Sequence, residues 1–232
     1  MGGELEEEGE GLARLPKTRT KTTSLGEKKA FKAGYSHIKK RDPKLRPILE
    51  ARGVIAFKPG GEPFESLVES ILSQQLAGSA ASAIIKKVRA LFPDGELEAR
   101  RMHRMDPKKL RAAGVSPQKL TYLKDLSSRV VKGTLDLGAL ESMTDEEILE
   151  VLDEVKGIGP WTIHMFLIFT LGRPDVLPVG DYGIQASVQR VYGLAELPKK
   201  AEIERLAEGW HPYSTVASLY LWHARDAPEP GA

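Results

Sequence analysis

Apolar residues in this chain recur at spacings of three and four, the period of an amphipathic helix. The clearest case is segment 64–76, where one face carries Phe64, Leu67, Val68, Ile71 and Leu72. Sustained alternation of apolar and polar residues, which a half-buried strand requires, is absent from the sequence. Helical segments joined by short loops predict an all-α protein.

The 232 residues are 41% apolar, enough for two small helical lobes. We expect residues 29–60 and 180–232 to form one lobe, residues 61–179 the other, and a cleft to lie between them. Residues 1–28 have few apolar side chains, and we expect a disordered tail there. Segment 11–58 holds fourteen Lys and Arg against three acids. This basic segment suits a polyanion, although for residues 1–28 we favour a solvated tail.

The composition excludes several classes of site. The chain has no cysteine, which excludes disulfides, thiol nucleophiles and cysteine-ligated zinc or iron–sulfur clusters. No apolar run reaches membrane-spanning length. The first residues are rich in glutamate rather than basic and then apolar, so we expect a cytoplasmic protein that is not exported.

Capping residues mark where several helices are expected to begin. Asp42 before a proline predicts one helix start, and Ser79 predicts a second. Asp106 and Ser116, each before a proline, predict two more. Segment 144–147 has the spacing of a capping box and predicts a helix that runs to residue 155.

The helix predicted over 145–155 and the apolar helix that follows it enclose a short turn. The turn reads Lys156, Gly157, Ile158 and Gly159, then Pro160. Its glycines permit positive φ angles and a close approach of a ligand to the backbone, while Ile158 is expected to pack inward. The next helix presents free N–H groups at its positive end, which suits a DNA phosphate. We therefore predict a helix-hairpin-helix over residues 145–171. An ordinary turn between helices is the alternative, and the turn carbonyls are potential ligands for a monovalent cation.

The segment Val155–Trp161, the helix to Leu171 and the stretch Leu177–Tyr182 together resemble the helix-hairpin-helix DNA glycosylase superfamily. Within it, the resemblance is to the 3-methyladenine DNA glycosylase II branch and its shorter all-helical relatives. Further matching stretches are 64–75, 110–119 and 210–222. The resemblance implies a monomer that flips an alkylated purine out of double-stranded DNA and hydrolyses its N-glycosidic bond without a cofactor. It also implies association with the nucleoid if the source is prokaryotic.

Asp181 occupies the position of the family's catalytic aspartate. A carboxylate can stabilise the positive sugar that forms as the base leaves, and it can orient or deprotonate the attacking water. Asp181 also precedes a predicted helix, so an N-cap role is the alternative, and the two roles are compatible.

The resemblance assigns base-pocket positions to Trp161, Trp222 and Met165, with Trp222 the first choice for stacking. Both tryptophans could instead be core residues. Some family members carry at position 161 a lysine that attacks the sugar and nicks DNA. Because this chain has Trp161 there, we predict a monofunctional glycosylase without lyase activity.

The loop after helix 64–76 aligns with the family's minor-groove wedge, which fills the gap left by the flipped base. Gln75 aligns with the inserted residue, and Leu76 lies beside it. The alternative is that Gln74 and Gln75 only cap a helix end.

Two other functions need fewer of these residues. A non-catalytic helix-hairpin-helix DNA-binding protein needs the hairpin but not Asp181, and a helical scaffold needs only the basic segment. The preferred lesion stays open among 3-methyladenine, 7-methylguanine and 1-methyladenine.

Overall fold

The computed structural model describes residues 24–26 and 28–225. Within them the chain is helical and contains no strand, which confirms the all-α prediction. The α-helices are α1 (Lys28–Arg41), α2 (Arg46–Arg52), α3 (Pro63–Ser73), α4 (Gly78–Arg89), α5 (Ala99–Arg104), α6 (Pro107–Ala112), α7 (Pro117–Lys132), α8 (Asp145–Asp153), α9 (Pro160–Phe169), α10 (Tyr182–Tyr192), α11 (Lys200–Ala207) and α12 (Ser214–Arg225). Three short 3₁₀ turns are η1 (Pro93–Gly95), η2 (Leu140–Ser142) and η3 (Glu208–Trp210).

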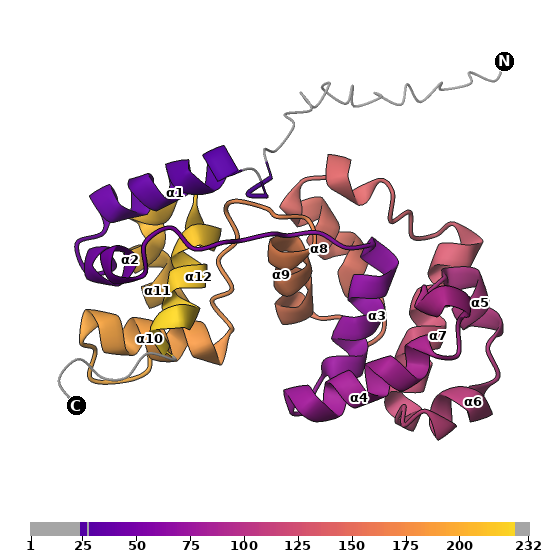
Figure 1. Ribbon diagram of the computed structural model, residues 1–232. Helices are drawn as coiled ribbons and strands as arrows, with labels where there is room; N and C mark the ends of the chain where they lie inside the picture. The colour runs from indigo at the N-terminus through magenta and orange to yellow at the C-terminus, as the bar shows by residue number, and fades with distance from the viewer. Residues whose placement is uncertain (1–23, 27, 226–232) are drawn as a thin grey trace, which may run out of the picture.

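The helices gather into two groups, seen on the right and left of Figure 1. Helices α3 to α9 enclose one cluster of buried side chains, and α1, α2 and α10 to α12 enclose a second. Phe57 and Trp222 pack against both clusters. Within the described residues, two segments, around residues 53–62 and 170–181, cross between the groups. This partition supports the two-lobe division, which we retain as a proposal.

Local capping signals placed some helices correctly and misplaced others. Asp106 and Ser116 cap α6 and α7, and Thr144 forms the expected capping box at α8. Ser79 is not a cap, because α4 begins one residue before it and has Ala77 at the N-cap. Asp42 has the contacts of a cap, but it caps the turn at residues 43–45, and α2 itself begins only at Arg46.

Asp42 has buried partners that the sequence did not reveal. The residue is 5% exposed, and its carboxylate accepts hydrogen bonds from the Trp210 indole at 2.7 Å and from the Tyr192 hydroxyl. The backbone N–H groups of Lys44 and Leu45 donate to the same carboxylate at 2.8 and 2.9 Å. Asp42 therefore caps the turn that leads into α2 and also ties the second cluster together, since a buried carboxylate requires such partners.

Most of the segment predicted to be a disordered tail lies outside the described residues. Its end, however, is ordered. The Leu25 side chain is fully buried in the second cluster, and its N–H donates to the Gly172 carbonyl at 2.8 Å. Helix α1 already starts at Lys28. A tail boundary at residue 28 is thus several residues too late.

The crossing segment 170–181 is held at both lobes by charged side chains. Arg173, 5% exposed, donates from Nη2 to the Met143 carbonyl at 2.8 Å. Its Nε lies 3.2 Å from Oδ1 of Asp145, an ion-pair contact without hydrogen-bond geometry. On the other side, Asp175 accepts from the Ser214 hydroxyl at 2.6 Å and contacts Nδ1 of His211 at 2.8 Å. These contacts fix the path of the chain that leads to Asp181.

Burial of Asp175 raises its pKa, but the hydrogen bonds from Ser214 and His211 outweigh that effect, and the net pKa is below 3.8.

The structure also bears on the membrane expectation. None of the helices in the described ranges is long and apolar enough to cross a bilayer.

Candidate active site

The predicted helix-hairpin-helix is formed by α8, a turn over residues 154–159, and α9. Val155 and Ile158 are 1% and 3% exposed and anchor the turn in the first cluster. The N–H of Ile158 donates to the Val155 carbonyl at 3.0 Å. The backbone N–H of Lys156 donates to Oδ2 of Asp125 at 3.0 Å, while the Lys156 residue itself is exposed. The turn is therefore rigid and presents its basic side chain outward.

Gly157 is required at its position for two reasons. Its φ is +80°, in the region that side chains disfavour. A Cβ added there would also lie 2.1 Å from a ring carbon of Tyr122. The Tyr122 hydroxyl accepts a hydrogen bond from Nε2 of Gln118 at 2.6 Å, which fixes the ring over the turn. Helix α7 therefore packs against the hairpin turn through the Tyr122 ring.

Gly159 differs from the expectation that both glycines take positive φ. Its φ and ψ are −118° and 178°, which any residue adopts, and an added Cβ would meet no atom within 4 Å. Gly159 is the N-cap of α9, and no side chain caps the first N–H groups of that helix. Because Gly159 has no side chain, the first N–H groups of α9 stay available to bind an anion.

The Asp181 carboxylate is held by three N–H donors. Oδ1 accepts from the Trp222 indole at 2.8 Å and from the Ile184 backbone at 2.9 Å. Oδ2 accepts from the Trp161 indole at 2.7 Å. The bond from Ile184 makes Asp181 the N-cap of α10, so the capping alternative is confirmed. Capping fixes the carboxylate where the two tryptophans meet.

The two tryptophans approach Asp181 from different elements. Trp161 lies at the start of α9 beside the hairpin and is 49% exposed, which excludes a core role. Trp222 lies on α12, is half-buried between the two clusters, and stacks on Phe169 with ring centroids 5.8 Å apart. Trp222 is therefore partly a packing residue, although its indole edge reaches the carboxylate.

A cavity of about 910 Å³ lies beside this carboxylate. Helices α3, α7 and α9 line it, and α9 contributes Trp161, Met165 and Phe169 at every fourth position. Asp181 and Trp222 do not line the cavity. They adjoin it through the Trp161 hydrogen bond and the Phe169 stack.

The predicted wedge residues lie at the cavity mouth. Gln75 and Leu76 are both exposed and line the cavity, and Leu76 is 39% exposed despite being apolar. Gln75 has φ +57°, one of two non-glycine residues with positive φ in the described chain. Strain of this kind concentrates at functional positions. Gln74 points elsewhere, and its Nε2 donates to the Gly157 carbonyl at 2.7 Å.

The Gln74 bond joins the wedge loop to the hairpin, so two segments far apart in sequence have a fixed spacing. It also occupies one of the turn carbonyls that were considered as cation ligands. The cation itself remains a prediction.

Lys119 supports the same loop from α7, because its Nζ donates to the Leu72 carbonyl near the end of α3 at 2.7 Å. Burial lowers the pKa of Lys119.

Several cavity residues escaped the sequence interpretation. Phe169 had a signal, since it continues the four-residue spacing of Trp161 and Met165 on one helix face. Tyr122 and Lys119 had none, because only packing of α7 against the hairpin brings them to the cavity. Glu69 on α3 was missed for a different reason, since an acid on a helix face reads as solvated.

A family model described as the HhH-GPD superfamily of base excision DNA repair proteins matches residues 68–212. This chain belongs to that superfamily. The match spans the wedge loop, the hairpin and Asp181, and it confirms the resemblance drawn from the sequence. DNA-3-methyladenine glycosylase 1 of Schizosaccharomyces pombe is 34% identical over 163 residues, covering 69% of this chain and 72% of that protein.

Two solved structures extend the comparison to the fold. The 3-methyladenine DNA glycosylase of Schizosaccharomyces pombe, in complex with abasic DNA, has a TM-score of 0.76 at 28% identity, covering 86% of this chain and 100% of that chain. A DNA-3-methyladenine glycosidase from Bacillus halodurans has a TM-score of 0.77 at 37% identity, covering 88% and 91%. The fold of this chain is therefore shared with solved structures of a 3-methyladenine DNA glycosylase and a DNA-3-methyladenine glycosidase.

Proposed function

We propose that this protein is a monofunctional DNA glycosylase that removes alkylated purines of the 3-methyladenine type from double-stranded DNA. The single observation that carries the proposal is the Asp181 carboxylate, fixed by two indoles between a hairpin and a cavity. A DNA-binding module has no need of such a carboxylate. The names of the relatives support the same reaction and the same substrate class.

The hairpin and the wedge loop prepare the DNA. The uncapped N–H groups at the start of α9 bind a phosphate without reading sequence. Gln75 and Leu76 enter the stack from the minor groove, and the alkylated base turns into the cavity, where Trp161 and Met165 form one wall. The Gln74 bond to Gly157 keeps the grip and the wedge at one distance.

The Asp181 carboxylate then acts on the sugar. The bond between C1′ and the base nitrogen breaks, and its electron pair leaves with the base, which neutralises the base's positive charge. The sugar becomes an oxocarbenium-like cation, which the fixed negative charge of Asp181 stabilises. Water attacks C1′ and releases a proton, so the products are the free base and an abasic site.

The hydrogen bonds around Asp181 suit this role. Oδ1 accepts two protein donors, which fills its lone pairs, whereas Oδ2 accepts only the Trp161 indole among the described residues. One lone pair of Oδ2 is therefore available to orient the attacking water or accept its proton.

Two observations support the absence of lyase activity. Position 161 carries an indole that donates to Asp181 and has no nucleophilic amine. Lys119 is the only lysine on the cavity lining within residues 24–26 and 28–225, and its Nζ is bound to the Leu72 carbonyl.

The test of the proposed reaction is base release from duplex DNA methylated by an SN2 methylating agent, with free bases resolved by chromatography. Wild type should release 3-methyladenine or 7-methylguanine, and Asp181→Asn should release neither at a comparable rate. Binding of undamaged duplex without any base release would favour the non-catalytic DNA-binding alternative.

The monofunctional assignment needs a separate test. Borohydride added during the reaction should trap no covalent protein–DNA adduct, and strands should stay intact until alkali or heat is applied. A trapped adduct would contradict the assignment and point to Lys119.

Light scattering of the free protein should give the mass of a monomer.

A further inference from the structure

The cavity has two chemically different walls. The α9 wall is apolar and carries Trp161, Met165 and Phe169. The facing α3 wall carries three serines and one acid, namely Ser66, Glu69, Ser70 and Ser73. A flat base that stacks on the aromatic wall presents its edge to a polar wall. Hydrogen bonding at that edge decides which bases the cavity accepts.

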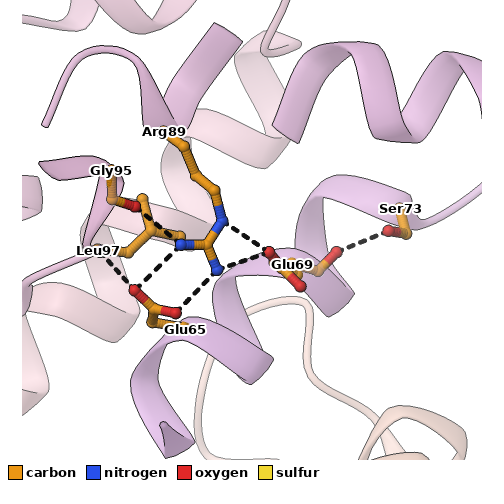
Figure 2. A network of polar contacts seen from close by, with 6 residues as sticks. All are labelled: Glu65, Glu69, Ser73, Arg89, Gly95 and Leu97. Carbon is orange, nitrogen blue, oxygen red and sulfur yellow. Dashed lines mark hydrogen bonds and ion pairs between the residues drawn. The ribbon is translucent and has the colours of Figure 1, made fainter. Parts of the chain in front are cut away.

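Glu69 is the only acid on the cavity lining within the described residues, and Arg89 of α4 holds it in place. Nε and Nη2 of Arg89 lie 3.0 and 2.8 Å from the same oxygen of Glu69, Oε1. Figure 2 shows both contacts on one carboxylate oxygen. Among the described residues, no hydrogen bond reaches the other oxygen, Oε2. The side chain is 38% exposed.

Glu65 lies one turn earlier on α3, contacts the same guanidinium, and does not line the cavity. Its Oε1 accepts from Nη1 of Arg89 at 3.2 Å and from the Leu97 backbone at 2.6 Å, and its Oε2 accepts from Nη2 of Arg89 at 2.8 Å. The Arg89 hydrogen bond lowers the pKa of Glu65, and the Glu65 bond raises the pKa of Arg89. Both oxygens of Glu65 are thus engaged in joining α3 to α4.

The charges of this network do not cancel. Two carboxylates share one guanidinium. Glu65 contacts it through both of its oxygens, whereas Glu69 contacts it through Oε1 alone (Figure 2). The remaining negative charge falls on Glu69, the member that faces the cavity. Lys119 is the other charged residue of the lining, but its ammonium is bound to the Leu72 carbonyl, near the negative end of the α3 dipole. A negative charge and a spare acceptor oxygen therefore remain on the polar wall.

We infer that Glu69 is a specificity-determining residue that selects positively charged bases with N–H donors on their edge. The inference rests on the proposed function, because it assumes that a flipped base enters this cavity. Glu69 Oε2 accepts an N–H from the base edge, and the carboxylate charge attracts a purine made cationic by N-alkylation. A neutral base with a carbonyl oxygen at the same edge meets repulsion. A hydrogen bond to a charged group at a partly exposed site corresponds to about a tenfold preference.

A purely structural role for Glu69 gives a different expectation. If Glu69 only joined α3 to α4, its removal would act like removal of Glu65, which has more contacts in the same network. The pair Glu69→Gln and Glu65→Gln therefore separates the two roles. Each substitution removes one charge next to Arg89, and only the first changes the cavity wall.

The experiment compares binding of two duplexes that differ in the charge of one base. One carries 7-methylguanine on a 2′-fluoro sugar, which resists hydrolysis, and the other carries the neutral isostere 7-deaza-7-methylguanine on the same sugar. Dissociation constants are measured for wild type, Glu69→Gln, Glu65→Gln and Glu69→Asp, each checked for folding by thermal unfolding. Wild type should prefer the cationic base by about tenfold.

Glu69→Gln should reduce that preference to about twofold or less, while Glu65→Gln retains it. Glu69→Asp keeps the charge beside Arg89 and should retain most of the preference even if Glu69→Gln unfolds. An unchanged preference in Glu69→Gln, an equal loss in Glu65→Gln, or a complete loss in Glu69→Asp would overturn the inference. Release of 7-methylguanine from an ordinary duplex by wild type is measured alongside. Its absence would count against the proposed function, whereas release with an unaltered preference counts only against Glu69.

Discussion

The hairpin glycines offer a substitution pair that separates folding from DNA binding. Gly157→Ala places a methyl group 2.1 Å from a ring carbon of Tyr122, at a residue whose φ is +80°. Positive φ costs a non-glycine residue about 1–2 kcal/mol. The ring must also move by more than about 1 Å to restore carbon contact distance, and overpacking of this kind costs about 1–3 kcal/mol.

The two contributions sum to about 2–5 kcal/mol of lost unfolding free energy. For a chain of this size, such a loss lowers the unfolding midpoint by about 4–20 °C. The Gln118 hydrogen bond to the Tyr122 hydroxyl opposes movement of the ring, so the loss should lie above the lower end. Circular dichroism at 222 nm, followed during heating, measures the midpoint.

Gly159→Asp is the matched variant in the same turn. A Cβ there meets no atom within 4 Å, and φ is −118°. Aspartate is a favoured N-cap, so the fold should be unaffected or slightly stabilised. The new carboxylate would stand where we place a DNA phosphate. Repulsion between like charges should weaken binding to all duplexes by about tenfold or more.

Fluorescence anisotropy with two undamaged duplexes of unrelated sequence measures that binding. Equal losses for both sequences are expected, because phosphate contacts carry no sequence information. A Gly157→Ala midpoint within about 2 °C of wild type would refute the packing reasoning. Wild-type affinity in Gly159→Asp would refute the phosphate reasoning, whatever the midpoint.

Trp161, Gln74 and Asp175 each make a contact whose loss should have a measurable effect. Trp161→Phe keeps a ring but removes the indole donor from Asp181. Single-turnover base release should therefore fall about tenfold at unchanged DNA affinity. An unchanged rate would show that this hydrogen bond does not position the carboxylate. Gln74→Ala removes the hydrogen bond to Gly157 and should lower the free energy of unfolding, measured in urea, by about 1 kcal/mol. Relative to wild type, it should slow base release from duplex DNA more than release from single-stranded DNA. Equal slowing on both substrates would contradict a role in wedge spacing. Because the pKa of Asp175 is lowered on folding, its carboxylate stabilises the fold above the unfolded-state pKa and loses that effect as pH falls through the folded-state pKa. Asp175→Asn should therefore have a lower free energy of unfolding than wild type at pH 7. Urea unfolding at several pH values should show this difference disappearing as pH falls below about 4. A difference that does not depend on pH would contradict this assignment.

Features set by neighbouring residues could be predicted from the sequence. The capping box at Thr144, the turn at Gly157 and the N-cap at Asp181 each depend on residues a few positions apart. Helical periodicity likewise placed α3, although the helix ends at Ser73 rather than at Leu76. The Gln75 loop begins there instead.

Features set by packing between distant segments could not be predicted. The sequence indicates Asp42 as a cap, but its buried hydrogen bonds with Tyr192 and Trp210 arise only when distant segments pack together. The same limit applies at the candidate site. The need for glycine at position 157 comes from Tyr122, and the acidic wall of the cavity comes from the way α4 meets α3. Sequence spacing contains neither relation.

The reaction proposed here depends most directly on the charge of Asp181. Asparagine has nearly the same shape and can still cap α10 through its amide oxygen, so Asp181→Asn removes the charge and leaves the helix start. The measurement is the single-turnover rate of 7-methylguanine release from duplex DNA, with affinity for undamaged duplex and the unfolding midpoint as controls. We predict a rate at least about a hundredfold below wild type, with both controls nearly unchanged. A rate within about tenfold of wild type would contradict the proposed role of the carboxylate.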